Sequence, residues 1–298
     1  MSTNHPDDAR KWVGRPIQRY EDFPLVTGQG TFTADIKAEL FARFVRSPIA
    51  SGKIERIAAP KGVRLITAQD LVGVKPIHLV LENYNYVPVE QPLLARDVVR
   101  FVGEPVAVVV ADSMEAAEDA ADLVELDISE TTPLVSIADA LAPDAPRVHD
   151  HAAGNVVVDG QFSSGPLPAN IFKRVRANVR SYREAALPME PRQAHANFDR
   201  VSGRVTFTCT TQSPHLFRTA IADLLGMAEA KLRVVAPDVG GGFGQKATLP
   251  PEFPVIVWLA SHFRTSVAWN EDRRENLLAG FHARDAELSV EGSFDADG

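Results

Sequence analysis

The sequence predicts a mixed α/β protein of the α+β class, with two domains, and three patterns support this class. An unbroken apolar run over 106–111 is typical of a buried strand. Polar and apolar residues alternate over 204–209, which indicates a half-buried strand. Apolar residues recur at helical spacing over 217–225, as on the core-facing side of a helix. The 298 residues suffice for two domain cores.

Prolines and changes in residue pattern divide the chain into four parts. A polar leader covers 1–20 and a first domain covers 21–142, in which strands alternate with helices. Within this domain Ser113 is a suitable cap for an alanine-rich helix that starts near Met114. Prolines and the absence of periodicity indicate a linker over 143–168, and the second domain covers 169–298.

The elements of the second domain follow from local signals. Ser213 and Pro214 predict a helix start, and Gly226 predicts its end. The next expected elements are a strand over 232–236, a helix over 251–261 and a strand over 265–269. The charged residues of 271–275 predict a helix start with local ion pairs. A final strand over 286–294 leads into a turn over 295–298.

Composition excludes several classes of function. The hydrophobic fraction of 45% is that of a globular protein, and the net charge of −8 argues against a nucleic-acid partner. Cys209 is the single cysteine, so this chain alone has no intrachain disulfide and no iron–sulfur cluster. No apolar run approaches the roughly 20 residues of a membrane span, and the polar N-terminus lacks a signal region. We therefore expect a cytoplasmic protein without a membrane partner.

The glycine run over 239–246 is the strongest functional signal. Four glycines in five positions follow an apolar strand, and successive backbone amides in such loops bind anionic groups. Gln245 stands where a Walker A loop needs the glycine before its lysine. The positions Gly242, Gly244 and Ala247 fit a dinucleotide fingerprint formally, but two prolines at 250 and 251 occupy the place of its helix. An NAD- or FAD-dependent oxidoreductase that uses 242–247 remains the alternative.

Several further motifs accompany this run in a fixed order. They comprise Gly28–Asp35, Phe44–Pro48, Phe101–Ala107, Met189–Arg192, Thr211–His215 and Val267–Leu278. In this order they resemble the molybdenum-binding subunit of the xanthine dehydrogenase and aldehyde oxidase family, from about Val13 onward. The resemblance implies an α/β hammerhead domain over 21–142. It also implies the first part of a molybdopterin cofactor-binding domain over 169–298.

The resemblance assigns roles to a few residues. Gln212 corresponds to the glutamine near the oxo ligand of the metal, and no protein side chain binds the metal itself. Gly241, Gly242, Phe243 and Gly244 form the backbone cradle of the cofactor, and the Phe243 ring flanks the substrate. Glu190 and Arg192 either orient the pterin or pair with each other.

The family also implies the reaction and the partners. We expect a molybdenum–molybdopterin cofactor, in the dinucleotide form, and oxidative hydroxylation of an aldehyde, N-heterocycle or related small molecule with oxygen from water. An iron–sulfur subunit with 2Fe–2S clusters and an FAD subunit would take the electrons. Ala247 stands where xanthine-type members carry a substrate-facing glutamate, so a purine substrate is not implied.

The family's catalytic glutamate belongs to a segment that this sequence lacks. We therefore expect a fragment, or a subunit split between two polypeptides, that is inactive without a partner supplying the C-terminal half. A non-catalytic assembly subunit or remnant remains a second alternative.

Overall fold

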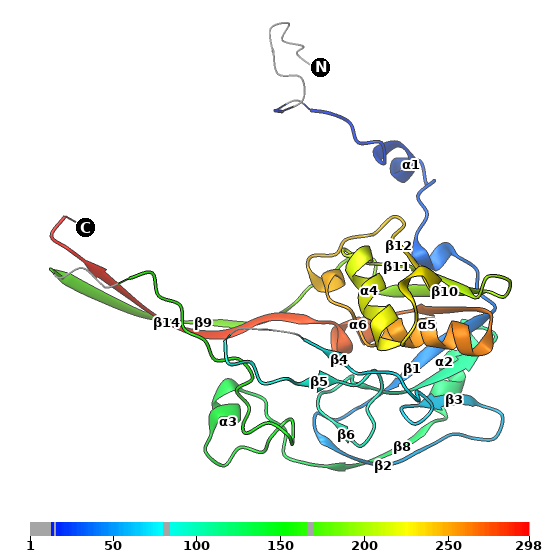
Figure 1. Ribbon diagram of the computed structural model, residues 1–298, viewed down its shortest axis with the longest axis horizontal. Helices are drawn as coiled ribbons and strands as arrows, with labels where there is room; N and C mark the ends of the chain where they lie inside the picture. Colours follow the sequence, from blue (N-terminus) through cyan, green and yellow to red (C-terminus); the bar gives the residue numbers. More distant parts are fainter. Residues whose placement is uncertain (1–12, 15, 80–83, 166–169, 298) are drawn as a thin grey trace, which may run out of the picture.

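A seven-stranded mixed sheet forms the centre of the molecule in the computed structural model, which describes residues 13–14, 16–79, 84–165 and 170–297 (Figure 1). The strand order is β12-β11-β10-β13-β1-β7-β3. The bounds of its strands are β1 Leu40–Arg46, β3 Arg64–Thr67, β7 Pro105–Ala111, β10 Gln193–Asp199, β11 Arg204–Cys209, β12 Leu232–Val235 and β13 Ser266–Asn270. Because β1 pairs in parallel with β13, strands from both halves of the chain share one sheet.

Three smaller sheets surround the central one. The first joins β2 Gly52–Ala58, β6 Val98–Val99 and β8 Glu125–Glu130. The second pairs β4 Ile77–His78 with β5 Glu90–Gln91. The third is a long ribbon of β9 Lys173–Ala185 and β14 His282–Phe294.

The helices confirm the local signals of the sequence. Their bounds are α1 Asp22–Val26, α2 Met114–Asp122, α3 Ile137–Leu141, α4 Pro214–Leu224, α5 Glu252–Phe263 and α6 Arg273–Ala279. The hydroxyl of Ser113 caps α2 by accepting from the Ala116 amide at 3.1 Å. Gly226 follows α4 with φ of 62°, the left-handed conformation expected after a helix end.

The helix α5 packs on the central sheet and forms part of the hydrophobic core beneath the end of β11. Phe253 of α5 is fully buried and meets Phe207, Phe217 and Trp269 edge-on, at centroid distances of 5.4, 6.0 and 6.3 Å. Such aromatic contacts add to the burial of large apolar surfaces. The end of β11 and the start of α4 are therefore fixed on a rigid base.

A buried charge network connects the two halves of the chain. Arg46 of β1 pairs with Glu252 of α5 at 2.8 Å and with Glu275 of α6 at 2.9 Å. Arg192 pairs with Glu271 and with Glu252, and all three side chains are at most 1% exposed. The local ion pairs expected over 271–275 are therefore wrong: the acidic residues bind arginines that are distant in sequence. Buried carboxylates need such partners because an unpaired buried charge is costly.

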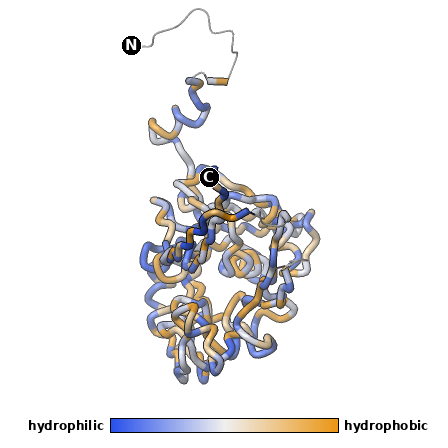
Figure 2. Tube along the Cα trace, turned by 90° about the vertical axis from the view of Figure 1, so that its left-hand side faces the viewer, coloured by the Kyte–Doolittle hydropathy of each residue, from blue (hydrophilic) through white to orange (hydrophobic). Residues whose placement is uncertain are grey.

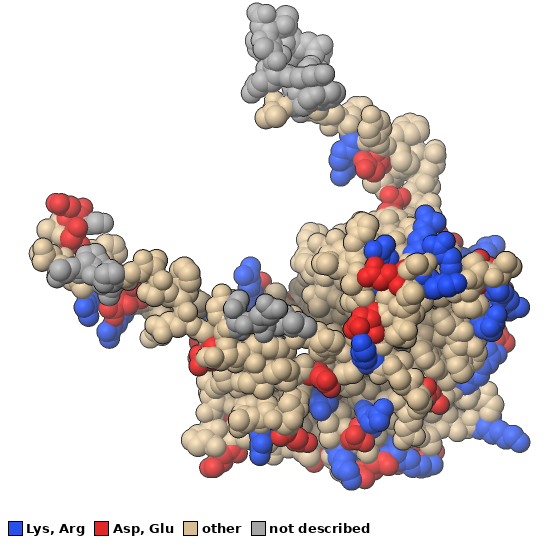
Figure 3. All heavy atoms as spheres, viewed as in Figure 1, with Lys and Arg blue, Asp and Glu red and all other residues tan. Residues whose placement is uncertain are grey.

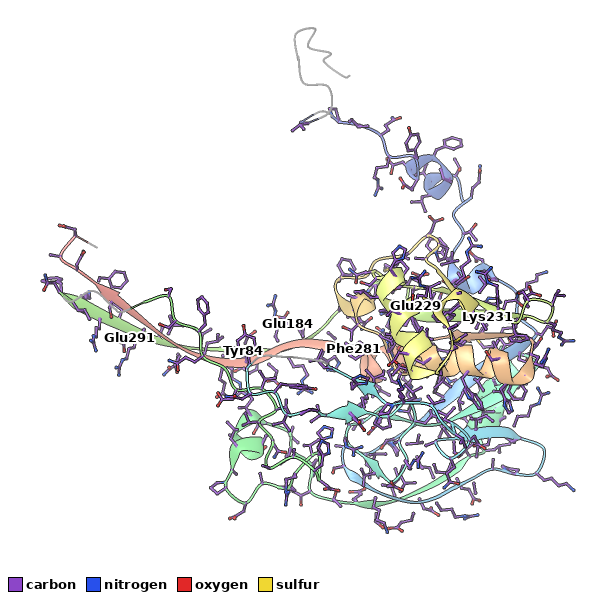
Figure 4. All side chains as sticks on the ribbon, viewed as in Figure 1. Tyr84, Glu184, Glu229, Lys231, Phe281 and Glu291 are labelled. Carbon is purple, nitrogen blue, oxygen red and sulfur yellow. The ribbon has the colours of Figure 1, made fainter. Side chains whose placement is uncertain are left out.

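The ribbon of β9 and β14 projects from the body (Figures 1 and 4). In Figure 4, Glu291 lies out on the ribbon and Phe281 lies at its base. Figure 3 shows both acidic and basic side chains on the ribbon. One cross-strand pair joins Arg176 and Glu291 at 2.5 Å. Val179 and Leu288 are register partners and are about half exposed, at 52% and 48%.

Several expected boundaries lie partly outside the described residues. Positions 1–12 and 15 of the leader, and 166–169 at the end of the linker and start of the second domain, belong to this group. Where it is described, the N-terminal segment with α1 stands apart from the body (Figure 2). Among the described helices, none has the length and apolar character that a bilayer crossing requires. The limits 21–142 and 169–298 stay predictions.

Candidate cofactor-binding site

Gln212 lies between the end of β11 and the start of α4, directly against the glycine loop, which we define as residues 239–246. Its backbone amide donates to the Lys246 carbonyl at 2.9 Å. Its side-chain oxygen Oε1 accepts from the Gly244 amide at 3.1 Å. Because an N–H must face the amide oxygen, the NH2 group of Gln212 is left as a donor. Gln212 is exposed, so this donor is available to a ligand.

Gly242 leaves no room for a side chain beside Gln212. A Cβ at this position would lie 2.6 Å from both Cδ and Oε1 of Gln212. Real Cβ contacts are not this short, so the close approach of loop and glutamine requires glycine. The sequence-predicted residues Gln212 and Gly242 are thus brought together by the fold.

Three successive amides of the glycine loop have no protein acceptor among the described residues. These are the N–H groups of Gly241, Gly242 and Phe243. The neighbouring amides are used internally: Gly240 donates to Glu190 at 2.7 Å and Gly244 donates to Gln212. A row of free backbone donors beside a free amide NH2 suits an anionic, oxygen-rich ligand.

Phe243 presents its ring to the outside of the loop. Its side chain is 76% exposed, which is unusual for an aromatic group of this size. Its backbone has φ of 50°, and the flanking Gly241 and Gly244 have φ of 96° and 88°. Non-glycine residues rarely adopt the left-handed region, and such positions cluster at functional sites.

The dinucleotide-binding alternative requires an α-helix that begins at the glycine loop. Gln245–Ala247 instead form one short 3-10 turn, and α5 begins only at Glu252. The helix N-terminus that would hold a pyrophosphate is therefore absent from this loop.

Gln245, near the end of the glycine loop, has a structural role. The side chain is buried, and its Oε1 accepts from Asn276 at 3.1 Å while its Nε2 donates to the Ala186 carbonyl at 3.3 Å. Its φ is not in the left-handed region, so a Cβ fits there. The glutamine therefore ties the loop to α6.

The pairing of Lys246 with Glu190 was not foreseen from the sequence. Lys246 is buried and its Nζ lies 2.9 Å from Glu190 Oε2. Burial lowers the pKa of Lys246, although the Glu190 carboxylate opposes this shift. Glu190 and Arg192 do not pair with each other, since Arg192 binds Glu271 and Glu252. No signal in the sequence indicated the contact between Glu190 and Lys246, because the two residues are 56 positions apart.

The donor set fits a cofactor that brings its own metal ligands. In the described part of the chain no three His, Cys, Asp or Glu side chains gather as a metal site. Cys209 is buried, and burial raises the pKa of its thiol, which disfavours the thiolate form. The exposed NH2 and the free amides can instead hold oxygen atoms of a bound group.

A further cavity lies away from the glycine loop. It measures about 840 Å³ and is lined by residues of both halves, including Phe101, Glu104, Leu278 and His282. None of its lining residues belongs to the glycine loop. The cavity lies between the base of the ribbon and the first half of the chain.

Comparisons with known proteins agree with this order of elements. Residues 27–132 match the a/b hammerhead domain of aldehyde oxidase and xanthine dehydrogenase, and residues 148–298 match the molybdopterin cofactor-binding domain. The nicotine 6-hydroxylase large subunit of Paenarthrobacter nicotinovorans is 36% identical over 98% of this chain and 37% of its own length. The carbon monoxide dehydrogenase large chain of Hydrogenophaga pseudoflava is 30% identical over 93% and 37%.

Solved structures give the same relationship. Quinoline 2-oxidoreductase from Pseudomonas putida 86 has a TM-score of 0.87 and 35% identity, covering 94% of this chain and 37% of its own. Carbon monoxide dehydrogenase from Oligotropha carboxidovorans has a TM-score of 0.81 and 30% identity, covering 96% and 38%. The chain thus spans somewhat more than a third of these relatives. It belongs to the xanthine dehydrogenase and aldehyde oxidase family and corresponds to part of the molybdopterin-binding large subunit of its molybdenum hydroxylases.

Proposed function

We propose that this chain forms one wall of the active site of a molybdenum hydroxylase, where Gln212 and Gly241–Gly244 hold a molybdenum–molybdopterin cofactor in its dinucleotide form. The observation that supports this most is the Gly244–Gln212 hydrogen bond of 3.1 Å. It fixes the Gln212 amide with its NH2 group turned outward, beside a loop with three free amides. When bound, the cofactor supplies the redox-active metal for hydroxylation with oxygen from water.

Each residue has one task in this proposal. The NH2 of Gln212 and the amides of Gly241 to Phe243 would donate to oxygen atoms of the bound cofactor. The exposed Phe243 ring covers one side of the substrate and excludes water from it. Fixed donors of this kind cost no reorganisation during the reaction.

We propose an aromatic N-heterocycle as substrate class, in preference to an aldehyde. Two of the similar proteins are named for nicotine and quinoline, and both compounds contain such rings. A flat ring can stack on Phe243. The exposed Ala247 offers no carboxylate to a purine, which argues against xanthine-type substrates.

The proposed assembly contains an iron–sulfur subunit with 2Fe–2S clusters, an FAD subunit and a polypeptide that supplies the rest of the large subunit. The ribbon supports the last partner. Its polar face is neutralised by cross-strand pairs such as Arg180 with Glu287, whereas Val179 and Leu288 remain exposed. A two-stranded ribbon is only marginally stable alone. We therefore propose that the chain is inactive without this partner, and that the assembly is cytoplasmic.

The test is substitution of Gln212 in the purified complex. We expect Gln212→Ala to lower the hydroxylation rate about 100-fold or more, since it removes one fixed donor. Gln69→Ala is the matched control, because Gln69 is an exposed glutamine after β3, at the opposite edge of the central sheet. An unchanged rate in Gln212→Ala would instead support a non-catalytic assembly subunit.

A further inference from the structure

We propose that Glu190 is a positioning residue that, with Lys246, holds both ends of the glycine loop and through them sets the orientation of Gln212. This inference rests on the proposed function for its consequence, which is retention of the cofactor. The contacts that define it concern the chain's own residues alone.

One carboxylate oxygen fastens the two ends of the loop. Glu190 Oε2 accepts from the Gly240 amide at 2.7 Å and from Lys246 Nζ at 2.9 Å. The Glu190 amide also donates to the Gly240 carbonyl at 3.3 Å. A Cβ on Gly240 would lie 2.6 Å from the Cβ of Glu190, so the loop start rests directly on this residue.

Lys246, at the C-terminal end of the loop, connects Glu190 to Gln212. The carbonyl of Lys246 accepts from the Gln212 amide at 2.9 Å, and the Gly244 amide binds Gln212 Oε1 at 3.1 Å. A continuous chain of hydrogen bonds thus links Glu190 through the loop and Lys246 to Gln212. Displacing Glu190 frees both ends of the loop at once.

Burying the ion pair of Glu190 and Lys246 costs free energy, so a contribution to stability does not by itself explain why the pair is there. The side chains of Lys246 and Glu190 are 0% and 9% exposed, and Glu190 Oε1 has no partner among the described residues. Buried ion pairs are weak contributors to stability and are replaceable by apolar pairs. An apolar side chain, however, cannot accept from the Gly240 amide. The carboxylate is therefore suited to fixing the loop's geometry.

The first measurement is amide hydrogen exchange of the 298-residue chain. We expect Glu190→Gln to increase exchange about tenfold or more at the hydrogen-bonded amides of this region, because it weakens a hydrogen bond to a charged group. These are the amides of Gly240, Gly244, Gln245, Ala247 and Gln212. Exchange in β10, β11 and α5 should not change. Glu229→Gln is the matched control, since Glu229 pairs with Arg218 at the same 2.9 Å on the surface of the molecule (Figure 4).

The second measurement is the molybdenum and pterin content of the purified complex. We expect both to fall in Glu190→Gln and to remain at wild-type levels in Glu229→Gln. Glu190→Asp, which keeps the carboxylate, should restore part of the content. If Glu190→Gln does not fold, Gly240→Ala serves instead, because its added Cβ moves the loop start away from Glu190.

The outcomes are distinguishable. Unchanged loop exchange in Glu190→Gln or Gly240→Ala would overturn the inference. Faster exchange with unchanged cofactor content would reduce the pair to a structural role. A wild-type complex without molybdenum would overturn the proposed function, while the exchange result would still decide whether Glu190 holds the loop.

Discussion

The substitution Gly242→Ala should disturb the position of Gln212 while leaving the free energy of unfolding almost unchanged. The φ of Gly242 is not in the left-handed region, so alanine meets no backbone strain there. The added Cβ would lie 2.6 Å from Cδ and Oε1 of Gln212. One of the two groups must therefore move.

The magnitudes indicate which group moves. Keeping Gln212 in place would overpack the contact at a cost of about 1–3 kcal/mol. Swinging the exposed Gln212 side chain into solvent loses one hydrogen bond, about 1 kcal/mol. Replacing glycine at a compatible φ returns about 0.4–1 kcal/mol by restricting the unfolded chain. We therefore expect the free energy of unfolding to change by less than about 1 kcal/mol.

The expected effect on function is much larger. If Gln212 leaves its position, the hydroxylation rate of the complex should fall about 100-fold, as for loss of one fixed donor. Urea unfolding of the chain and the rate of the complex are the two assays, with Gln69→Ala as control. A wild-type rate in Gly242→Ala, or a loss of more than about 3 kcal/mol in the free energy of unfolding, would show that Gln212 does not move as expected.

Three further predictions concern the loop and the core. Gly244→Ala meets no atom within 4 Å but has φ of 88°, so it should lower the free energy of unfolding by about 1–2 kcal/mol through strain alone, as urea unfolding would show. Phe253→Ala should lower it by about 3–5 kcal/mol by leaving a cavity among three aromatic rings; a loss below about 1 kcal/mol would contradict this packing. Burial alone would raise the pKa of Glu252, but Arg192 and Arg46 outweigh this effect and hold the pKa below 4.5. The ionised carboxylate therefore stabilises the fold above pH 4.5, and this stabilisation is lost as the pH falls through the folded-state pKa. The destabilisation by Glu252→Gln, measured by unfolding at several pH values, should therefore be greatest near neutral pH and shrink in acid; a pH-independent difference would contradict it.

Local signals in the sequence were sufficient for most elements. The apolar run over 106–111 became β7, and Ser113 and Ser213 precede α2 and α4. Only the Ser113 side chain accepts a cap hydrogen bond, so the capping role expected of Ser213 is wrong although the helix start is right. These features depend on residues within one turn or strand of each other, and hence on chemistry that is visible in the sequence. The glycine loop was recognised in the same way, because four glycines in five positions restrict what the backbone can do.

Long-range partners could not be predicted. Glu271 and Glu275 were expected to form local ion pairs, yet they bind arginines 79 and 229 residues away. The pairing of Glu190 with Lys246 was equally invisible, because the strand order of the central sheet brings them together. The resemblance supplied Gln212 and Phe243, but only the folded structure shows that the Gly244 amide is bound to Gln212.

The most direct test of the central claim is the metal and pterin content of the complex that contains this chain, purified from its native source. We expect molybdenum and molybdopterin in stoichiometric amounts with this chain in the wild-type complex, and a marked loss of both in Glu190→Gln. A catalytically active complex without molybdenum would contradict this claim.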